Sequence, residues 1–134
     1  MADWKLPENL KYAESDEWIR VEGDTAQIGL TDYAQDQLSD IVFVDLSEIE
    51  VGGTVTKGEA FGVVESAKAA SDVYAPASGQ IVAINSALDN APEAINNYPY
   101  GDGWLIEIRL SNPSDLNDLM DSAAYLKHCE ARVG

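Results

Sequence analysis

The chain has 134 residues, with 24 acidic and 8 basic side chains and a formal net charge of −16 at pH 7. This length fits one domain with a core large enough to fold without disulfides or metals. A polyanion of this strength repels nucleic-acid phosphates and acidic membrane surfaces, and no segment approaches the roughly 18 consecutive apolar residues of a membrane helix. We therefore expect a monomer that binds neither nucleic acid nor membranes and meets partners with basic faces, unless the acidity serves solubility alone.

The first part of the chain predicts a β-hairpin followed by a short helix. Apolar residues alternate over 19–21 and over 26–30, on either side of a turn at 22–24, which is the pattern of two antiparallel strands. Thr31 is a good helix N-cap, and the apolar spacing that follows predicts one or two helical turns over 32–38.

The middle of the chain predicts further short strands separated by glycine and proline turns. The run 41–46 is almost continuously apolar, which predicts a strand covered on both faces. Other strands are expected over 61–64, 73–75, 81–84 and 104–110. Asn, Pro, Asp and Gly dominate residues 85–103, which predicts a long irregular connection with one helical turn near Pro92.

The C-terminal segment changes to a helical pattern. Asn112 can cap a helix that has Pro113 at its first position, and an apolar stripe of Leu116, Leu119 and Met120 follows. Ser122 can cap a second helix carrying the apolar residues Tyr125, Leu126 and Cys129. Cys129 is the only cysteine, so no intrachain disulfide can form, and we interpret it as a helix-face residue in a reducing compartment.

Lys68 is the strongest candidate for chemistry. It lies within 65–72, between a strand that ends at Val64 and one that starts at Val73, so a hairpin tip should present it to solvent. Its neighbours Ala67 and Ala69 give a modifying enzyme little steric obstruction. A lone lysine in a turn is usually an ordinary surface residue, and only the surrounding sequence favours a special role.

That surrounding sequence resembles the lipoyl-attachment motif of glycine cleavage H proteins: residues 64–76 read VESAKAASDVYAP. The resemblance continues through GLTDYAQ at 29–35, DIVFV at 40–44, PYGDGW at 99–104 and the tail 116–125. Related biotinyl carriers usually flank their lysine with methionines, and lipoyl domains of 2-oxoacid dehydrogenases usually carry Asp-Lys-Ala on long multidomain chains. Both alternatives fit this chain less well.

The resemblance implies a mainly β fold with minor α, a barrel-sandwich hybrid of antiparallel strands like those of lipoyl and biotinyl carriers. The C-terminal helices would pack on the sheets. We expect a single lipoyl-carrier domain over 1–134, with a hairpin at 61–76 presenting Lys68 and a helical segment at 112–131. The implied cofactor is lipoate, attached covalently to Lys68, and no metal is expected.

By the same resemblance the protein is not an enzyme but a shuttle of the glycine cleavage system. It would carry an aminomethyl intermediate from glycine decarboxylase (P protein) to the tetrahydrofolate-dependent aminomethyltransferase (T protein), and a dithiol to dihydrolipoyl dehydrogenase (L protein). Lipoylating enzymes would be further partners. The compartment would be the bacterial cytoplasm or, for a processed eukaryotic form, the mitochondrial matrix. Two alternatives stay open, namely a lipoate relay that donates lipoyl groups to other carriers and a non-lipoylated interaction module.

The resemblance also assigns roles to further residues. Glu65 and Gly79, three residues before and eleven after the lysine, would help the lipoylating enzyme to recognise the hairpin. Ser15, Glu17 and Asp72 would line a cleft that holds the amine of the loaded arm; a solvated acidic strand edge is the alternative.

This chain departs from the family pattern at three positions. Asp16 stands where the family usually has histidine, Ser39 where it has glycine and Ser47 where it has proline. If the backbone at position 39 has a positive φ angle, serine there should cost about 1 kcal/mol.

Overall fold

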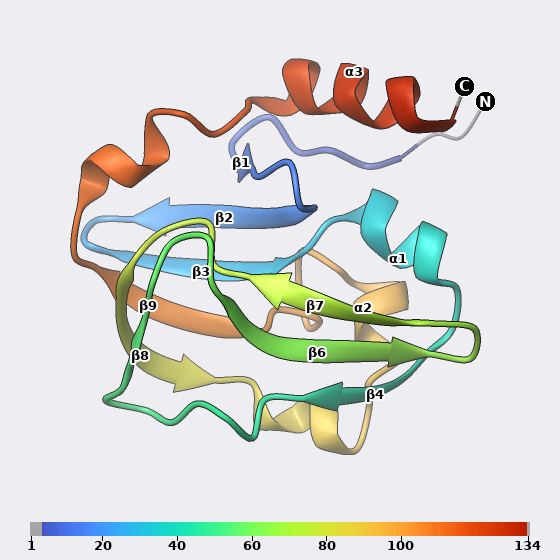
Figure 1. The fold of residues 1–134 in the computed structure, drawn as a ribbon, viewed down its shortest axis with the longest axis horizontal. Coiled ribbons are helices and arrows are strands. Elements are labelled where there is room, and N and C mark those ends of the chain that lie inside the picture. Colours follow the sequence, from blue (N-terminus) through green and yellow to red (C-terminus); the bar gives the residue numbers. More distant parts are fainter. Residues whose placement is uncertain (1–3, 134) are drawn as a thin grey trace.

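The computed structural model describes residues 4–133, and antiparallel β-structure dominates it (Figure 1). The strands, in chain order, are β1 (Lys11–Tyr12), β2 (Glu17–Glu22), β3 (Thr25–Leu30), β4 (Ile41–Asp45), β5 (Thr54–Val55), β6 (Ala60–Ser66), β7 (Ala70–Tyr74), β8 (Gly79–Ile84) and β9 (Ile106–Leu110). The helices are α1 (Asp32–Leu38), the 3₁₀ turn η1 (Ser86–Asp89), α2 (Ala94–Asn97), the 3₁₀ turn η2 (Pro113–Leu116) and α3 (Ser122–Val133).

The strands form two sheets. One has six strands in the order β1-β2-β3-β9-β8-β5, the other has three in the order β4-β6-β7, and every pairing is antiparallel. This arrangement confirms the expected mainly β fold of antiparallel strands and is that of a barrel-sandwich hybrid. Among the described residues no helix is long and apolar enough to cross a membrane.

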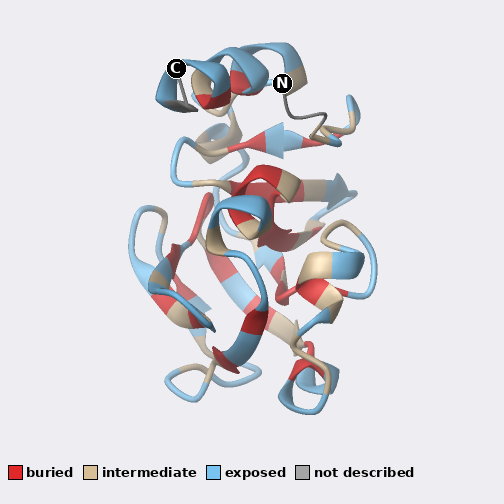
Figure 2. Ribbon diagram, turned by 90° about the vertical axis from the view of Figure 1, so that its right-hand side faces the viewer, coloured by how far each residue is buried: buried red, intermediate tan, exposed pale blue. Residues whose placement is uncertain are grey.

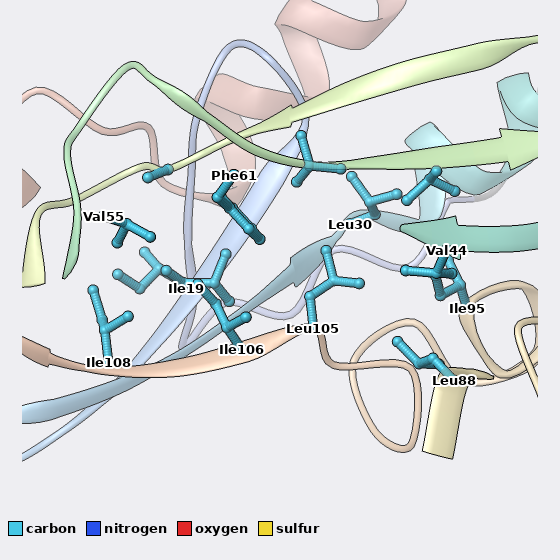
Figure 3. Close-up of a cluster of buried hydrophobic side chains, with 14 of the residues drawn as sticks. Ile19, Leu30, Val44, Val55, Phe61, Leu88, Ile95, Leu105, Ile106 and Ile108 are labelled. Carbon is cyan, nitrogen blue, oxygen red and sulfur yellow. The ribbon is translucent and has the colours of Figure 1, made fainter. Parts of the chain in front are cut away.

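Two apolar clusters hold the layers together. The larger cluster fills the space between the sheets, with Ile19, Phe61 and Ile106 among its buried side chains (Figure 3). The smaller one includes Tyr12 and Tyr125, which stack with ring centroids 4.8 Å apart. Through this second cluster α3 packs over β1, with its buried side facing the sheet (Figure 2). The expected packing of a C-terminal helix on the sheets is confirmed.

Helix α1 forms where the capping signal predicted it. The Thr31 hydroxyl oxygen accepts a hydrogen bond from the Ala34 N–H at 3.1 Å, as an N-cap does. The helix ends at Ser39, whose φ of 69° lies in the left-handed region and whose ψ is −152°. The positive φ considered for this position is therefore present.

The prediction that strand 41–46 is covered on both faces is wrong. Val42 and Phe43 are 57% and 50% exposed. β4 lies at an edge of the three-stranded sheet, and a bulge between Ile41 and Phe43 interrupts its pairing with β6. Because a bulge inserts an extra residue into the ladder, two consecutive side chains face solvent.

The expected C-terminal helices also differ in detail. Asn112 caps only the 3₁₀ turn η2. The chain then turns over residues 117–119 before Met120 pairs with Tyr12 through two backbone hydrogen bonds of 2.8 Å. The stripe predicted to continue to Met120 is therefore not one helix. α3 is capped by Asp121, whose carboxylate accepts from the Ala124 N–H at 2.8 Å, and not by Ser122.

Candidate functional site

The tip of the β6–β7 hairpin is a tight turn built around Ser66. The Ser66 N–H donates to the Ala69 carbonyl at 2.7 Å. The Ser66 hydroxyl oxygen accepts from the N–H groups of Lys68 and Ala69 at 3.2 and 3.0 Å. One side chain thus pairs amide groups of the turn that the β-ladder cannot reach, which gives the tip a defined shape.

Lys68 is exposed at this tip. The Ala67 N–H donates to the Asp40 carbonyl at 3.1 Å, which ties the tip to the loop before β4. The ion pairs formed by the described residues all involve other side chains. A rigid turn with small neighbours therefore presents the lysine amine to an approaching enzyme, and the geometry fits a lysine that carries a covalent group.

The two residues assigned to lipoylation recognition lie in different environments. Glu65 is exposed on β6, between its cross-strand neighbours Phe43 and Ala70. Gly79 is buried and pairs with Leu110 at the start of β8.

The packing around Gly79 leaves no room for a side chain. A Cβ atom there would lie 2.4 Å from the Arg109 carbonyl oxygen. Packing therefore requires glycine at this position whether or not an enzyme recognises it.

Glu17 is completely buried at the start of β2. Its carboxylate accepts one hydrogen bond from the Ser15 hydroxyl and another, of 3.0 Å, from the Tyr74 N–H on β7. The interpretation of this segment as a solvated acidic edge is therefore wrong for Glu17. Its carboxylate instead connects the six-stranded sheet to the hairpin that carries Lys68.

Burial is also what perturbs the ionisation of Glu17. Desolvation raises the pKa of its carboxyl group to about 7, against the hydrogen bonds from Ser15 and Tyr74, which lower it. Losing water penalises the charged form of an acid. A cation placed beside this carboxylate would therefore gain more than it would at a hydrated surface.

A cleft of about 330 Å³ is lined by Ser15 and Tyr74, the two residues that donate to the Glu17 carboxylate, whereas Glu17 itself lies buried behind them. The lining of the cleft also includes Pro76, with Leu119 and Met120 from the C-terminal segment. The walls combine these groups with the charged side chains of Glu14, Lys57 and Asp118, the last two of which form an ion pair. Such a cleft can receive an apolar arm that ends in a charged head.

Asp72 does not belong to the hydrogen-bonded group. It lies exposed on β7, and none of the hydrogen bonds found within residues 4–133 joins its carboxylate to Ser15 or Glu17. The structure joins Ser15 to Glu17 by a hydrogen bond, and the role expected of Asp72 stays a prediction. Within the same residues no group of His, Cys, Asp and Glu side chains could hold a metal ion.

Sequence reasoning missed two partners of this site. The Tyr74 backbone amide has no side-chain signature that a sequence could display. Asp16 was noted only as a replacement for histidine, whereas its carboxylate binds Arg132 and accepts from the Tyr125 hydroxyl. The one signal in the sequence for this contact was that Asp16 is a charged residue directly beside Ser15 and Glu17.

Comparison with known proteins gives a consistent result. The family profile described as Glycine cleavage H-protein matches residues 10–132. Glycine cleavage system H proteins of Symbiobacterium thermophilum and Opitutus terrae are 52% and 53% identical to this chain, covering 90% and 91% of it and 92% and 95% of their own length. A mitochondrial H protein of Flaveria pringlei is 54% identical over 92% of this chain and 75% of its own.

The fold comparison agrees with the sequence matches. The crystal structure of a glycine cleavage system H protein from Mycobacterium marinum superposes with a TM-score of 0.82 at 39% identity, covering 91% of this chain and 97% of the other. The chain therefore belongs to the glycine cleavage H-protein family, and its role is that of the lipoyl-bearing shuttle in the glycine cleavage system.

Proposed function

We propose that Lys68 is the residue that bears the lipoyl group, through an amide bond to its Nζ. When bound, lipoate supplies a disulfide that can accept a one-carbon amine unit on one sulfur. Once that unit has been passed on, the lipoyl group remains on the carrier as a dithiol. The observation that carries the assignment is the exposed Lys68 on a turn held by Ser66 and by the Asp40 carbonyl. That turn lets the lysine project without obstruction from Ala67 or Ala69.

The chain's contribution is then to carry and not to catalyse. We propose that it visits glycine decarboxylase, the aminomethyltransferase and dihydrolipoyl dehydrogenase in turn, after modification by a lipoylating enzyme. A tethered group meets each active site at a higher effective concentration than a free one. The matches to bacterial and mitochondrial relatives support the bacterial cytoplasm or the mitochondrial matrix as its compartment.

Between visits, we propose that the loaded arm folds into the cleft beside Ser15 and Glu17, with Asp72 at its approach. A buried carboxylate can hold a cationic amine by a charge-assisted hydrogen bond, and the apolar wall formed by Leu119 and Met120 limits access of water. Both effects slow the loss of a labile cargo. The same Glu17 carboxylate accepts from Tyr74 on β7, so it lies at the root of the hairpin that bears the lysine.

The experiment that tests the attachment site is peptide mass spectrometry after expression with lipoate available. Lipoylation is expected on Lys68 alone. Lys68→Arg should keep the fold and abolish shuttling, because a guanidinium is not a competent amine for amide formation. Lys57 serves as the matched control, since its amine contacts Asp118 and the Asp115 carbonyl and Lys57→Arg should leave lipoylation unchanged. A lipoyl group on Lys57, or on no lysine, would overturn the proposal.

A further inference from the structure

Asp16 stands between Ser15, which lines the cleft, and the buried Glu17, in the turn that joins β1 to β2. Its φ of 82° makes it one of two non-glycine residues with positive φ in the described part of the chain. Backbone hydrogen bonds set the turn: the Asp16 N–H donates to the Ala13 carbonyl and the Ala13 N–H to the Glu17 carbonyl. Any relaxation of Asp16 therefore displaces both of its neighbours.

The side chain of Asp16 is held by the C-terminal helix. Its carboxylate accepts two hydrogen bonds from the Arg132 guanidinium, at 2.5 and 3.1 Å, and a third from the Tyr125 hydroxyl at 2.8 Å. This bidentate geometry is the strong form of an arginine–carboxylate pair. The two side chains are also mostly covered, with 33% of Arg132 and 19% of Asp16 exposed.

Arg132 lies on α3 and is itself held by contacts that also involve α1. Its guanidinium lies over the Tyr33 ring at 4.3 Å, and the Tyr125 hydroxyl that shares the Asp16 carboxylate is also 2.7 Å from the Thr31 hydroxyl. Side chains from α1 and α3 thus hold Asp16, which lies between Ser15 and Glu17. Positive φ is unfavourable for a residue with a Cβ, so these side-chain contacts add to the backbone hydrogen bonds that hold the turn in this form.

We infer that Arg132 and Asp16 are positioning residues, through which α3 holds Ser15 and Glu17 in the orientation that receives the cargo amine. Neither residue lines the cleft. They act through the backbone of the turn. The inference rests on the proposed function for its consequence in the loaded carrier, although the positioning itself can be measured in the unmodified chain.

The first test needs no lipoyl group. The Tyr74 N–H donates to the Glu17 carboxylate, so its hydrogen exchange measured by NMR reports whether Glu17 stays in place. Arg132→Gln should speed exchange of this amide at least about threefold, the effect of a modest coupling within one hydrogen-bond network. Arg109→Gln is the matched control, because Arg109 pairs only loosely with Asp24, at 3.8 Å on the surface. Unchanged Tyr74 exchange in Arg132→Gln would overturn the inference.

The second test asks whether the positioning matters to the cargo. The lipoylated chain is loaded with glycine by glycine decarboxylase, the decarboxylase is removed, and the loaded species is followed by mass. Arg132→Gln should shorten its lifetime at least about threefold while the extent of lipoylation stays unchanged. Arg132→Lys should restore part of the lifetime, because it returns the positive charge without the bidentate fork.

A double-variant cycle separates positioning from general destabilisation. In a Glu17→Gln background the group to be positioned has lost its charge, so Arg132→Gln should add nothing further to the decay. Additive effects would overturn the inference. If Glu17→Gln alone leaves the lifetime unchanged, the proposed cleft function fails. The positioning contact still stands in that case if Tyr74 exchange responds to Arg132→Gln. The two measurements therefore distinguish failure of the proposed function from failure of the positioning inference.

Discussion

Replacing Ser39 with glycine should stabilise the protein. At φ 69° and ψ −152° this serine occupies a backbone region that is essentially reserved for glycine. The favourable contacts of the residue come from its backbone: its N–H donates to the Gln35 carbonyl at 3.0 Å, and its carbonyl accepts from the Asn96 side chain at 2.9 Å. Ser39→Gly keeps both bonds and removes the strain.

The size of the effect follows from two opposing terms. Holding a residue with a side chain in this region costs about 1–3 kcal/mol, whereas glycine loses about 0.5–1 kcal/mol more backbone entropy on folding. The net gain in the free energy of unfolding should be about 1 kcal/mol. In a chain of this size that corresponds to a rise in Tm of roughly 3–5 °C.

Urea denaturation of matched variants checks this reasoning. Ser111 is an exposed serine outside the positive-φ residues, so Ser111→Gly should show only the entropic loss of up to about 1 kcal/mol. The two glycine variants should therefore move the unfolding midpoint in opposite directions. If Ser39→Gly is no more stable than the parent chain, or shifts in the same direction as Ser111→Gly, the strain argument is refuted.

Three further predictions concern ionisation, packing and charge. Burial raises the pKa of Glu17 to about 7, so its contribution to the free energy of unfolding is complete below the unfolded pKa near 4.5 and is lost as pH rises through 7. Urea titrations of the parent chain and Glu17→Gln should show their difference in free energy of unfolding shrinking across that pH window. Gly79→Ala should lower the free energy of unfolding by about 1–3 kcal/mol through overpacking against Arg109, whereas Gly101→Ala, whose Cβ would meet Tyr98 at 3.7 Å, should change it little. Because the chain has a net charge of −16, the apparent KM values of the decarboxylase and the aminomethyltransferase for it should rise with salt, since ions screen electrostatic steering over about 8 Å at physiological ionic strength. KM values that do not change with salt would mean that the acidity serves solubility.

The parts of the fold that the sequence predicted are those whose signals are local. The hairpin turn at 22–24 and the Thr31 cap are set by residues close in the chain, and both formed as expected. The exposure of Phe43 was not predictable, because it depends on a bulge against β6 and on β4 lying at a sheet edge. Apolar composition alone cannot distinguish an edge strand from a central one.

The same division applies to the site. Lys68 was found because its turn and its motif lie within one short segment. The burial of Glu17 depends on Tyr74, 57 residues away, and the grip on Asp16 depends on Arg132, 116 residues away. Contacts between residues so far apart leave no periodic pattern in a single sequence. Without knowledge of those partners, an acidic segment is therefore predicted to be exposed to solvent.

These long-range contacts also decide which variant can reveal what Glu17 does. Glu17→Ala would remove the charge and, with it, the acceptor for the Tyr74 N–H, leaving a buried amide unpaired at a cost of about 1–3 kcal/mol. A shorter cargo lifetime would then have two causes, the missing charge and a loosened hairpin. Glu17→Gln keeps an oxygen for Tyr74 and offers its amide nitrogen to the Ser15 hydroxyl, so only the charge is lost. A shorter lifetime with unchanged Tyr74 exchange in that variant would assign the retention of the cargo to the carboxylate charge itself.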